Sequence, residues 1–188
     1  SQSFTMKGVL YLMDGKTYRA VRKSSKSTVW EAVFVSGTAY VPTTTISAAP
    51  TGGGTSYEAV NLLTPKRINT FIGDGTATQF KLDATDLDET AVTAEVNGSA
   101  VTVSAVNRST GLVTLATAPA NGNGLANVSI AFAKTVSGYA DKINKCRFAG
   151  LYGGKNDTRV FLSGNPDEPD CDWQSGLYDP TYFPDTGY

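Results

Sequence analysis

Residues 92–103 read VTAEVNGSAVTV, and this stretch decides the fold class. From 92 to 96 every second residue is apolar, which is the period of a β-strand with one buried face. Asn97-Gly98 then marks a type I′ turn, because both central positions of that turn need a positive φ. The alternation resumes at residues 101–103. The stretch therefore predicts a β-hairpin.

Similar short strands are predicted at regular spacing on both sides of this hairpin. Turn sequences rich in Gly, Asn and Asp separate them, a pattern typical of all-β sandwiches. The predicted strands are residues 68–72, 79–82, 112–115 and 128–132. We expect an immunoglobulin-like β-sandwich over residues 67–137.

The N-terminal segment predicts a hairpin and a further strand. Residues 9–13 and 17–21 flank Asp14-Gly15, a strong turn signal. Residues 22–26 read as a basic loop before a strand at 28–35. Because that strand is largely apolar at both odd and even positions, we expect burial on both of its faces.

The C-terminal segment predicts a second hairpin, with strands at 147–152 and 159–163 joined by a turn at 153–157. We expect an all-β chain in which residues 1–66 and 138–188 together form a β-unit, with the sandwich inserted into it. Such an insertion costs little closure entropy, because the ends of a domain commonly lie close together.

The balance of charges argues against a polyanionic partner. The 188 residues include 16 basic and 17 acidic side chains, a net charge of −1. No strong field would attract nucleic acid, so we expect no nucleic-acid binding. No apolar run is long enough to span a bilayer, and we expect no membrane insertion. The sequence begins and ends abruptly, and we expect it to be a fragment of a longer protein.

The chain has no histidine. This removes the commonest general base, the commonest metal ligand and the usual nucleophilic triad. Two cysteines, Cys146 and Cys171, are too few for a structural zinc site without histidine. They could pair, or remain free thiols as in a protein assembled in a cytosol. We expect no catalytic residues and no cofactor.

The densest acidic cluster is Asp167, Glu168, Asp170 and Asp172. Carboxylates this close could bind Ca²⁺, with Asp167, Asp170 and Asp172 as the candidate ligands, although the spacing lacks the glycine and terminal glutamate of an EF-hand. They could also supply the acid/base pair of a glycosidase. The alternative, which we favour, is a solvated acidic loop.

Aromatic residues are concentrated near the C-terminus. They could form a platform that stacks on a sugar or binds a protein partner. The alternative, which we favour, is that they pack against the neighbouring sheet. The candidates for partner or glycan binding are Trp173, Tyr178, Tyr182 and Phe183, with Tyr188 beyond them.

Several of these segments resemble proteins of tailed-bacteriophage particles. The segments YVPTTTI (40–46), PTGGGT (50–55) and NLLTPKR (61–67) resemble a stretch of virion proteins encoded among head–tail genes. RVFLSGNP (159–166) with WQSG (173–176) and DPTYFP (179–184) is similar to blades of phage β-propeller proteins. A third stretch looks like the immunoglobulin-like modules that decorate phage tails and fibres. It runs from FIGDG (71–75) through residues 96–98 and 118–119 to Val128.

The resemblance implies a non-enzymatic structural component of the phage neck or tail. Such a protein would assemble in the bacterial cytoplasm, reside in the virion and contact other virion proteins, including copies of itself. A complete propeller needs about four blades, and the two ends supply one or two. The first alternative is a carbohydrate-binding or adhesin module that recognises a host-surface glycan. The second is a glycan hydrolase that uses Asp and Glu.

Overall fold

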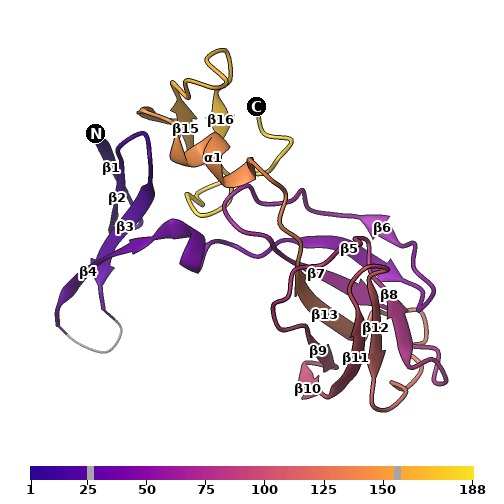
Figure 1. Cartoon of the computed structure of the whole chain (residues 1–188). Helices are drawn as coiled ribbons and strands as arrows, with labels where there is room; N and C mark the ends of the chain where they lie inside the picture. The colour runs from indigo at the N-terminus through magenta and orange to yellow at the C-terminus, as the bar shows by residue number, and fades with distance from the viewer. Residues whose placement is uncertain (25–27, 155–157) are drawn as a thin grey trace. The chain divides into compact units, whose positions relative to one another are not determined.

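The computed structural model describes residues 1–24, 28–154 and 158–188 (Figure 1). Strands make up 43 % of the chain and helices 5 %, which confirms the all-β class. The predicted turns at 22–26 and 153–157 lie partly outside the described residues. No helix among the described residues is both long and apolar enough to cross a membrane.

The chain divides into two compact units. The first unit contains Ser1–Tyr40, Asn61–Thr64 and Val136–Tyr188. The second unit contains Val41–Val60 and Pro65–Thr135.

The second unit is a β-sandwich. Its larger sheet has the order β10 (Ser99–Val101), β9 (Thr93–Val96), β13 (Val128–Ala133), β7 (Lys66–Phe71), β5 (Thr43–Ala48) and β6 (Thr55–Ser56). Its smaller sheet has the order β11 (Val103–Asn107), β12 (Leu112–Leu115) and β8 (Gln79–Lys81). Apolar side chains from both sheets form one core, which includes Phe71, Phe80, Val113, Leu115, Val128 and Ile130.

The hairpin that decided the fold class forms as predicted. Val96 pairs with Ser99, and the two turn residues Asn97 and Gly98 have φ of 50° and 76°. Ala94 is buried in the core while its neighbour Glu95 is exposed, so the alternation seen in the sequence matches the two faces of β9.

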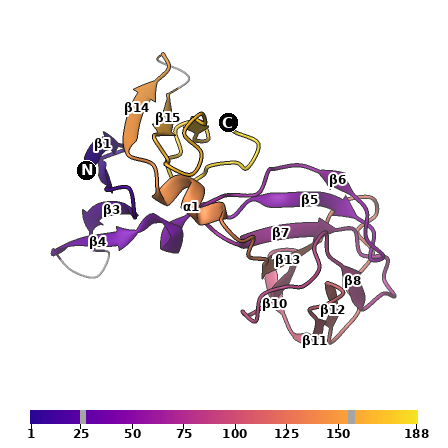
Figure 2. The same ribbon diagram turned by 45° about the horizontal axis from the view of Figure 1, so that its top comes forward.

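The predicted boundary at residue 66 needs correction, because residues 41–60 belong to the second unit. Strand β5 lies parallel to β7 in the larger sheet, with Thr43 opposite Ile68 (Figure 2). Parallel neighbours are joined by a long connection instead of a tight turn, so no local sequence signal marks their pairing.

A polar cluster fastens β5 to β7. Asp83 Oδ2 accepts hydrogen bonds from Thr44 Oγ1 at 2.5 Å, Thr45 Oγ1 at 2.8 Å and Asn69 Nδ2 at 2.9 Å. Both threonines and Asn69 are buried, and buried polar groups need such partners. The carboxylate therefore stabilises the parallel pair.

The first unit begins with a four-stranded antiparallel meander (Figure 1). Its strands are β1 (Gln2–Met6), β2 (Val9–Met13), β3 (Tyr18–Lys23) and β4 (Trp30–Phe34), followed by the 3-10 turn η1 (Val35–Thr38). A single propeller blade has the same up-and-down order of four strands. The turn between β2 and β3 is capped by Asp14, whose Oδ1 accepts hydrogen bonds from the backbone of Thr17 and Lys16.

The remainder of the first unit holds one short helix and a three-stranded sheet. The helix is α1 (Tyr139–Asn144), and the sheet has the order β14 (Phe148–Tyr152), β15 (Arg159–Ser163) and β16 (Trp173–Gln174). The core of this unit includes Tyr11, Tyr18, Val35, Ile143, Leu162, Trp173 and Phe183.

Asn61 joins three segments of the first unit that are far apart in sequence. Its Nδ2 donates to the carbonyls of Tyr40 and Thr181, both at 2.8 Å. Its Oδ1 accepts from the backbone N–H of Leu63 at 3.1 Å and of Phe183 at 3.0 Å. The residue is only 1 % exposed, so these four bonds use the full capacity of a buried side-chain amide.

Replacing Asn61 with Ala should lower the free energy of unfolding of the first unit by about 3 kcal/mol, because four backbone groups lose a hydrogen bond, and those to Leu63 and Phe183 are buried. Both tryptophans, Trp30 and Trp173, lie in the first unit, so their fluorescence during urea unfolding reports on it. Asn107→Ala, at the exposed end of strand β11 in the second unit, is the control and should leave this transition unchanged. An Asn61→Ala midpoint equal to that of the unchanged chain would contradict the role given to the amide.

Candidate functional site

The register of the meander gives its two faces different characters. Leu10 lies opposite Val21, and Val21 opposite Ala32, so these three side chains share one face. The alternate residues, among them Phe4, Tyr11 and Tyr18, stack on one another and face the core. We call the first face the outer face; on β2, β3 and β4 it consists of Leu10, Leu12, Arg19, Val21, Lys23, Trp30, Ala32 and Phe34.

Large apolar side chains on the outer face are open to solvent. Trp30 is 64 % exposed and Phe34 is 51 % exposed, at the two ends of β4. The prediction that this strand is buried on both faces is therefore wrong. The strand is apolar at both odd and even positions, which fits a strand covered on both faces, but its outer face lies open to solvent. Exposed apolar patches of this kind mark interaction surfaces.

The cations on the outer face lie beside its aromatic rings. The guanidinium carbon of Arg19 is 4.2 Å from the centroid of the Phe34 ring, a cation–π contact. Lys23 is the cross-strand partner of Trp30. Glu31, the one acidic residue of β4, lies on the opposite face, where its Oε1 is 3.2 Å from Arg22 Nε. The outer face is thus apolar and cationic.

Strand β4 is the edge of its sheet in the described part of the chain. Ser24 N–H donates to the Val29 carbonyl at 2.9 Å, so Ser24 and Val29 are a hydrogen-bonded pair. This pair identifies the residues of β4 that exchange hydrogen bonds with β3. Since hydrogen-bonded pairs alternate along an antiparallel ladder, Glu31 and Val33 direct their backbone groups toward β3. Trp30 and Ala32 direct both of theirs away from the sheet. Phe34 directs its N–H group away, while its carbonyl belongs to η1, for which Phe34 is the N-cap. Edge strands are commonly protected by Lys, Pro or a bulge, and residues 30–34 of β4 have none of these.

A second candidate site is a hollow of about 480 Å³ beside Trp173 in the first unit. Lys142 Nζ lies 2.6 Å from Glu168 Oε1 and 4.7 Å from the Trp173 ring centroid. Within the described residues, neither Trp173 Nε1 nor Glu168 Oε2 has a hydrogen-bond partner although both are buried. Tyr188 is exposed and its ring lies 5.3 Å from that of Trp173.

The predicted aromatic candidates are distributed between core and surface. Trp173 and Phe183 are buried in the core of the first unit, as the packing alternative predicts for them. Tyr178 and Tyr182 are half-buried, and the ring of Tyr182 lies 5.1 Å from that of Tyr40. The four side chains therefore do not form one open platform.

The candidate calcium ligands are exposed. Asp167 Oδ2 lies 2.6 Å from Lys145 Nζ, so an ammonium group already neutralises it. Asp170 and Asp172 are solvent-exposed. In the chain as described, no three Asp, Glu, Cys or His side chains converge in a way that could hold a metal ion.

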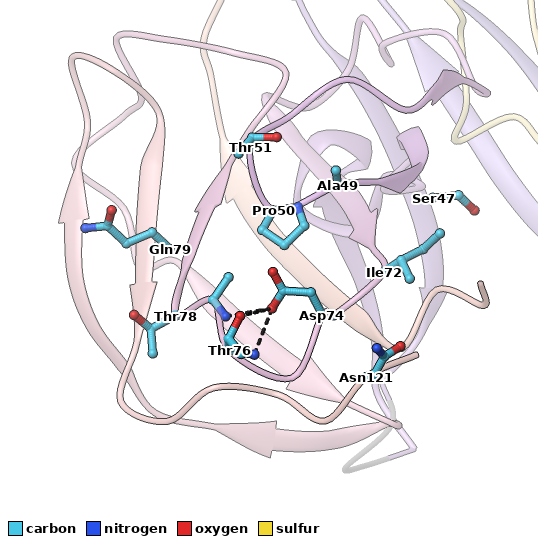
Figure 3. A pocket seen from close by; sticks show the side chains of 12 residues that line it. Ser47, Ala49, Pro50, Thr51, Ile72, Asp74, Thr76, Thr78, Gln79 and Asn121 are labelled. Atoms are coloured by element: carbon cyan, nitrogen blue, oxygen red, sulfur yellow. Dashed lines mark hydrogen bonds between the residues drawn. The ribbon is translucent and has the colours of Figure 1, made fainter. Parts of the chain in front are cut away.

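A second hollow, of about 830 Å³, opens at one end of the sandwich and was not predicted (Figure 3). Hydroxyl and amide side chains such as Ser47, Thr51 and Gln79 line it, and none of its twelve lining residues is aromatic. Asp74 Oδ1 accepts hydrogen bonds from the backbone of Ala77 at 2.7 Å and Thr76 at 2.8 Å. These bonds lower the pKa of the Asp74 carboxyl, and they show that it caps the turn at residues 73–75.

Comparison with known proteins adds no relative. No family model matches the chain, and neither a curated protein nor a solved structure matches it. The candidate sites are therefore assessed on their geometry alone.

The two cysteines are free, and their environments differ. Cys146 is buried beside α1, and its Sγ lies 3.1 Å from the Lys142 carbonyl. Burial raises the pKa of the Cys146 thiol to about 12, with smaller contributions from the negative charges of Asp172 and Glu168. Cys171 is half-buried.

A thiol reagent at pH 8 should therefore modify Cys171 quickly and Cys146 slowly. Only the thiolate attacks the reagent, and Cys146 stays protonated until the pH approaches 12. Spectrophotometric thiol titration of the folded chain should give one fast and one slow phase, and the chain in guanidinium should give two fast thiols. Cys171→Ser should remove the fast phase. Loss of the slow phase instead would contradict the assignment.

Proposed function

We propose that the chain is a non-enzymatic structural component of a phage particle, in the neck or tail, and that it acts by binding neighbouring proteins. The observation that carries this proposal is the outer face of the meander. It combines exposed Trp30 and Phe34 with an unprotected sheet edge. Aromatic residues with adjacent arginine are the typical anchors of protein interfaces.

The assignment to a phage particle rests on the sequence resemblance. The segments that resemble virion proteins, residues 40–46 and 61–67, lead into β5 and β7. The blade-like segments, residues 159–166 and 173–176, contain β15 and β16. Strand β5 pairs with β7 within the second unit, and β15 pairs with β16 within the first.

A carbohydrate-binding or adhesin module is the second candidate function. The hollow beside Trp173 supports it, because the exposed Tyr188 ring could stack on a sugar. A sugar hydroxyl group that entered the hollow would donate a hydrogen bond to Glu168 Oε2 or accept one from Trp173 Nε1. We favour protein contact because Trp173 is only 2 % exposed, whereas the outer face offers open aromatic rings.

The full-length protein should sediment with tailed particles purified on a density gradient from cultures of the strain that encodes it. Trp30→Ser combined with Phe34→Ser should reduce the particle-bound fraction by about tenfold, because interface aromatics carry most of the binding energy. Tyr57→Ser, at an exposed tyrosine of the second unit, is the matched control and should sediment as the unchanged protein does. Quantitative immunoblotting of gradient fractions measures the effect. A protein found only in the soluble fractions would contradict the proposal.

A glycan array probed with the purified chain separates the two functions. We expect no glycan to be bound, because on β2, β3 and β4 the outer face carries no carboxylate or amide side chain that could bind sugar hydroxyl groups. Binding that is lost on Tyr188→Ala and retained in the Trp30→Ser, Phe34→Ser double variant would instead support the carbohydrate-binding module.

A further inference from the structure

We propose that the partner of strand β4 is a second copy of this chain, paired edge to edge and antiparallel about a two-fold axis at Ala32. This inference rests on the proposed function, since it names the partner of the same surface. The two meanders would then form one continuous eight-stranded sheet.

The hydrogen-bond pattern of β4 allows this register. Trp30 and Ala32 direct their N–H and C=O groups away from β3, and Phe34 directs its N–H group away, as the ladder phase shows. A two-fold axis at Ala32 places Ala32 opposite Ala32 of the second copy. It places Trp30 opposite Phe34 of the second copy, and the reverse. The two Ala32 residues can therefore exchange two hydrogen bonds, and each Phe34 N–H group meets the Trp30 carbonyl of the other copy, as strand addition requires.

The side chains of β4 are self-complementary in this register. The strand reads WEAVF, with a large aromatic residue at each end of the outer face and a small one in the middle. Each Trp30 ring meets a Phe34 ring across the axis, and cross-strand aromatic pairs contribute about 0.2–1 kcal/mol each relative to alanine. The small Ala32 at the axis lets the two backbones approach without a clash.

Charge does not oppose the pairing. Across the new boundary, the side chains that lie side by side on the outer face form rows. In each row, Arg19 and Phe34 of one copy are followed by Trp30 and Lys23 of the second copy. The two cations of a row are three strand spacings apart, about 14 Å, which exceeds the screening length of about 8 Å at physiological salt. Each cation meanwhile lies beside an aromatic ring of its own or the other copy. On the opposite face Glu31, already paired with Arg22, meets neutral Val33 of the second copy.

The pairing closes after two copies. At the other edge of the meander, β1 lies beside β14, and the Ala149 N–H donates to Gln2 Oε1 at 2.8 Å. In the part of the sheet that the structure describes, β4 is thus the edge open to strand addition, and a two-fold interface uses it up. Such isologous interfaces produce dimers and do not propagate into filaments.

The test is disulfide trapping of the purified chain. Ala32→Cys in a Cys171→Ser background places one reactive thiol at the axis, since Cys146 is buried. Paired residues lie about 5.5 Å apart in a hydrogen-bonded pair, within the reach of a disulfide. Under a mild copper–phenanthroline oxidant, this variant should convert mainly to a covalent dimer on a non-reducing gel. Val21→Cys, on the same face but one strand further in, is the matched control. It should stay monomeric, because its partner lies about 14 Å away.

Sedimentation equilibrium of the chain without added cysteine completes the test. We expect a reversible dimer whose dissociation constant rises at least tenfold in the Trp30→Lys, Phe34→Lys double variant, with the circular-dichroism spectrum unchanged. A chain that remains monomeric at about 0.5 mM, or a dimer in which Ala32→Cys fails to cross-link, would overturn the inference. A monomeric chain that still sediments with particles would refute only the second copy as partner and leave the proposed function standing.

Discussion

The first unit depends on the side-chain amide of Asn61. A buried amide is stable only when its donors and acceptor are all satisfied, and here all four bonds go to backbone groups, of residues 40, 63, 181 and 183. Residues 41–60 of the second unit separate Tyr40 from Asn61, and residues 65–135 of that unit lie between residues 61–63 and 181–183. The first unit is therefore assembled from three pieces, and its core can close only when the C-terminal segment has returned to Asn61. The stability of the first unit therefore depends strongly on this single polar residue, which holds the three pieces together.

The closed core determines which surfaces remain. The inner face of the meander is covered because Phe4, Tyr11 and Tyr18 stack and Tyr18 meets Phe183 edge-on. The opposite face has no such cover in the described chain, so Trp30 and Phe34 stay in contact with water. Hydrophobic burial is the main favourable term in association, and an open aromatic surface gains most from a partner. The same alternation that builds the sheet thus produces the proposed contact surface, and function follows from what the fold leaves uncovered.

The sequence predicted features that depend on neighbouring residues and missed those that depend on distant ones. Asn97-Gly98 fixed a hairpin because the turn requirement is local. Lys7-Gly8 makes a comparable turn between β1 and β2, with φ of 51° and 75°, but it was not recognised, so β1 was missed. The pairing of β5 with β7 and the openness of β4 depend on which segment lies alongside, which periodicity cannot show. For the candidate site, Trp173 and Phe183 were favoured as packing residues and are buried, whereas the strand at 28–35 was expected to be buried on both faces and has one open face.

The central claim is that the edge and outer face of β4 form a contact surface. Residue-resolved hydrogen exchange of the chain at low and high concentration tests it most directly. The account predicts that the amides of Trp30, Ala32 and Phe34 exchange fast when dilute and become protected when concentrated, while those of Glu31 and Val33 are slow throughout. Fast exchange at all three outward positions, whatever the concentration, would contradict it.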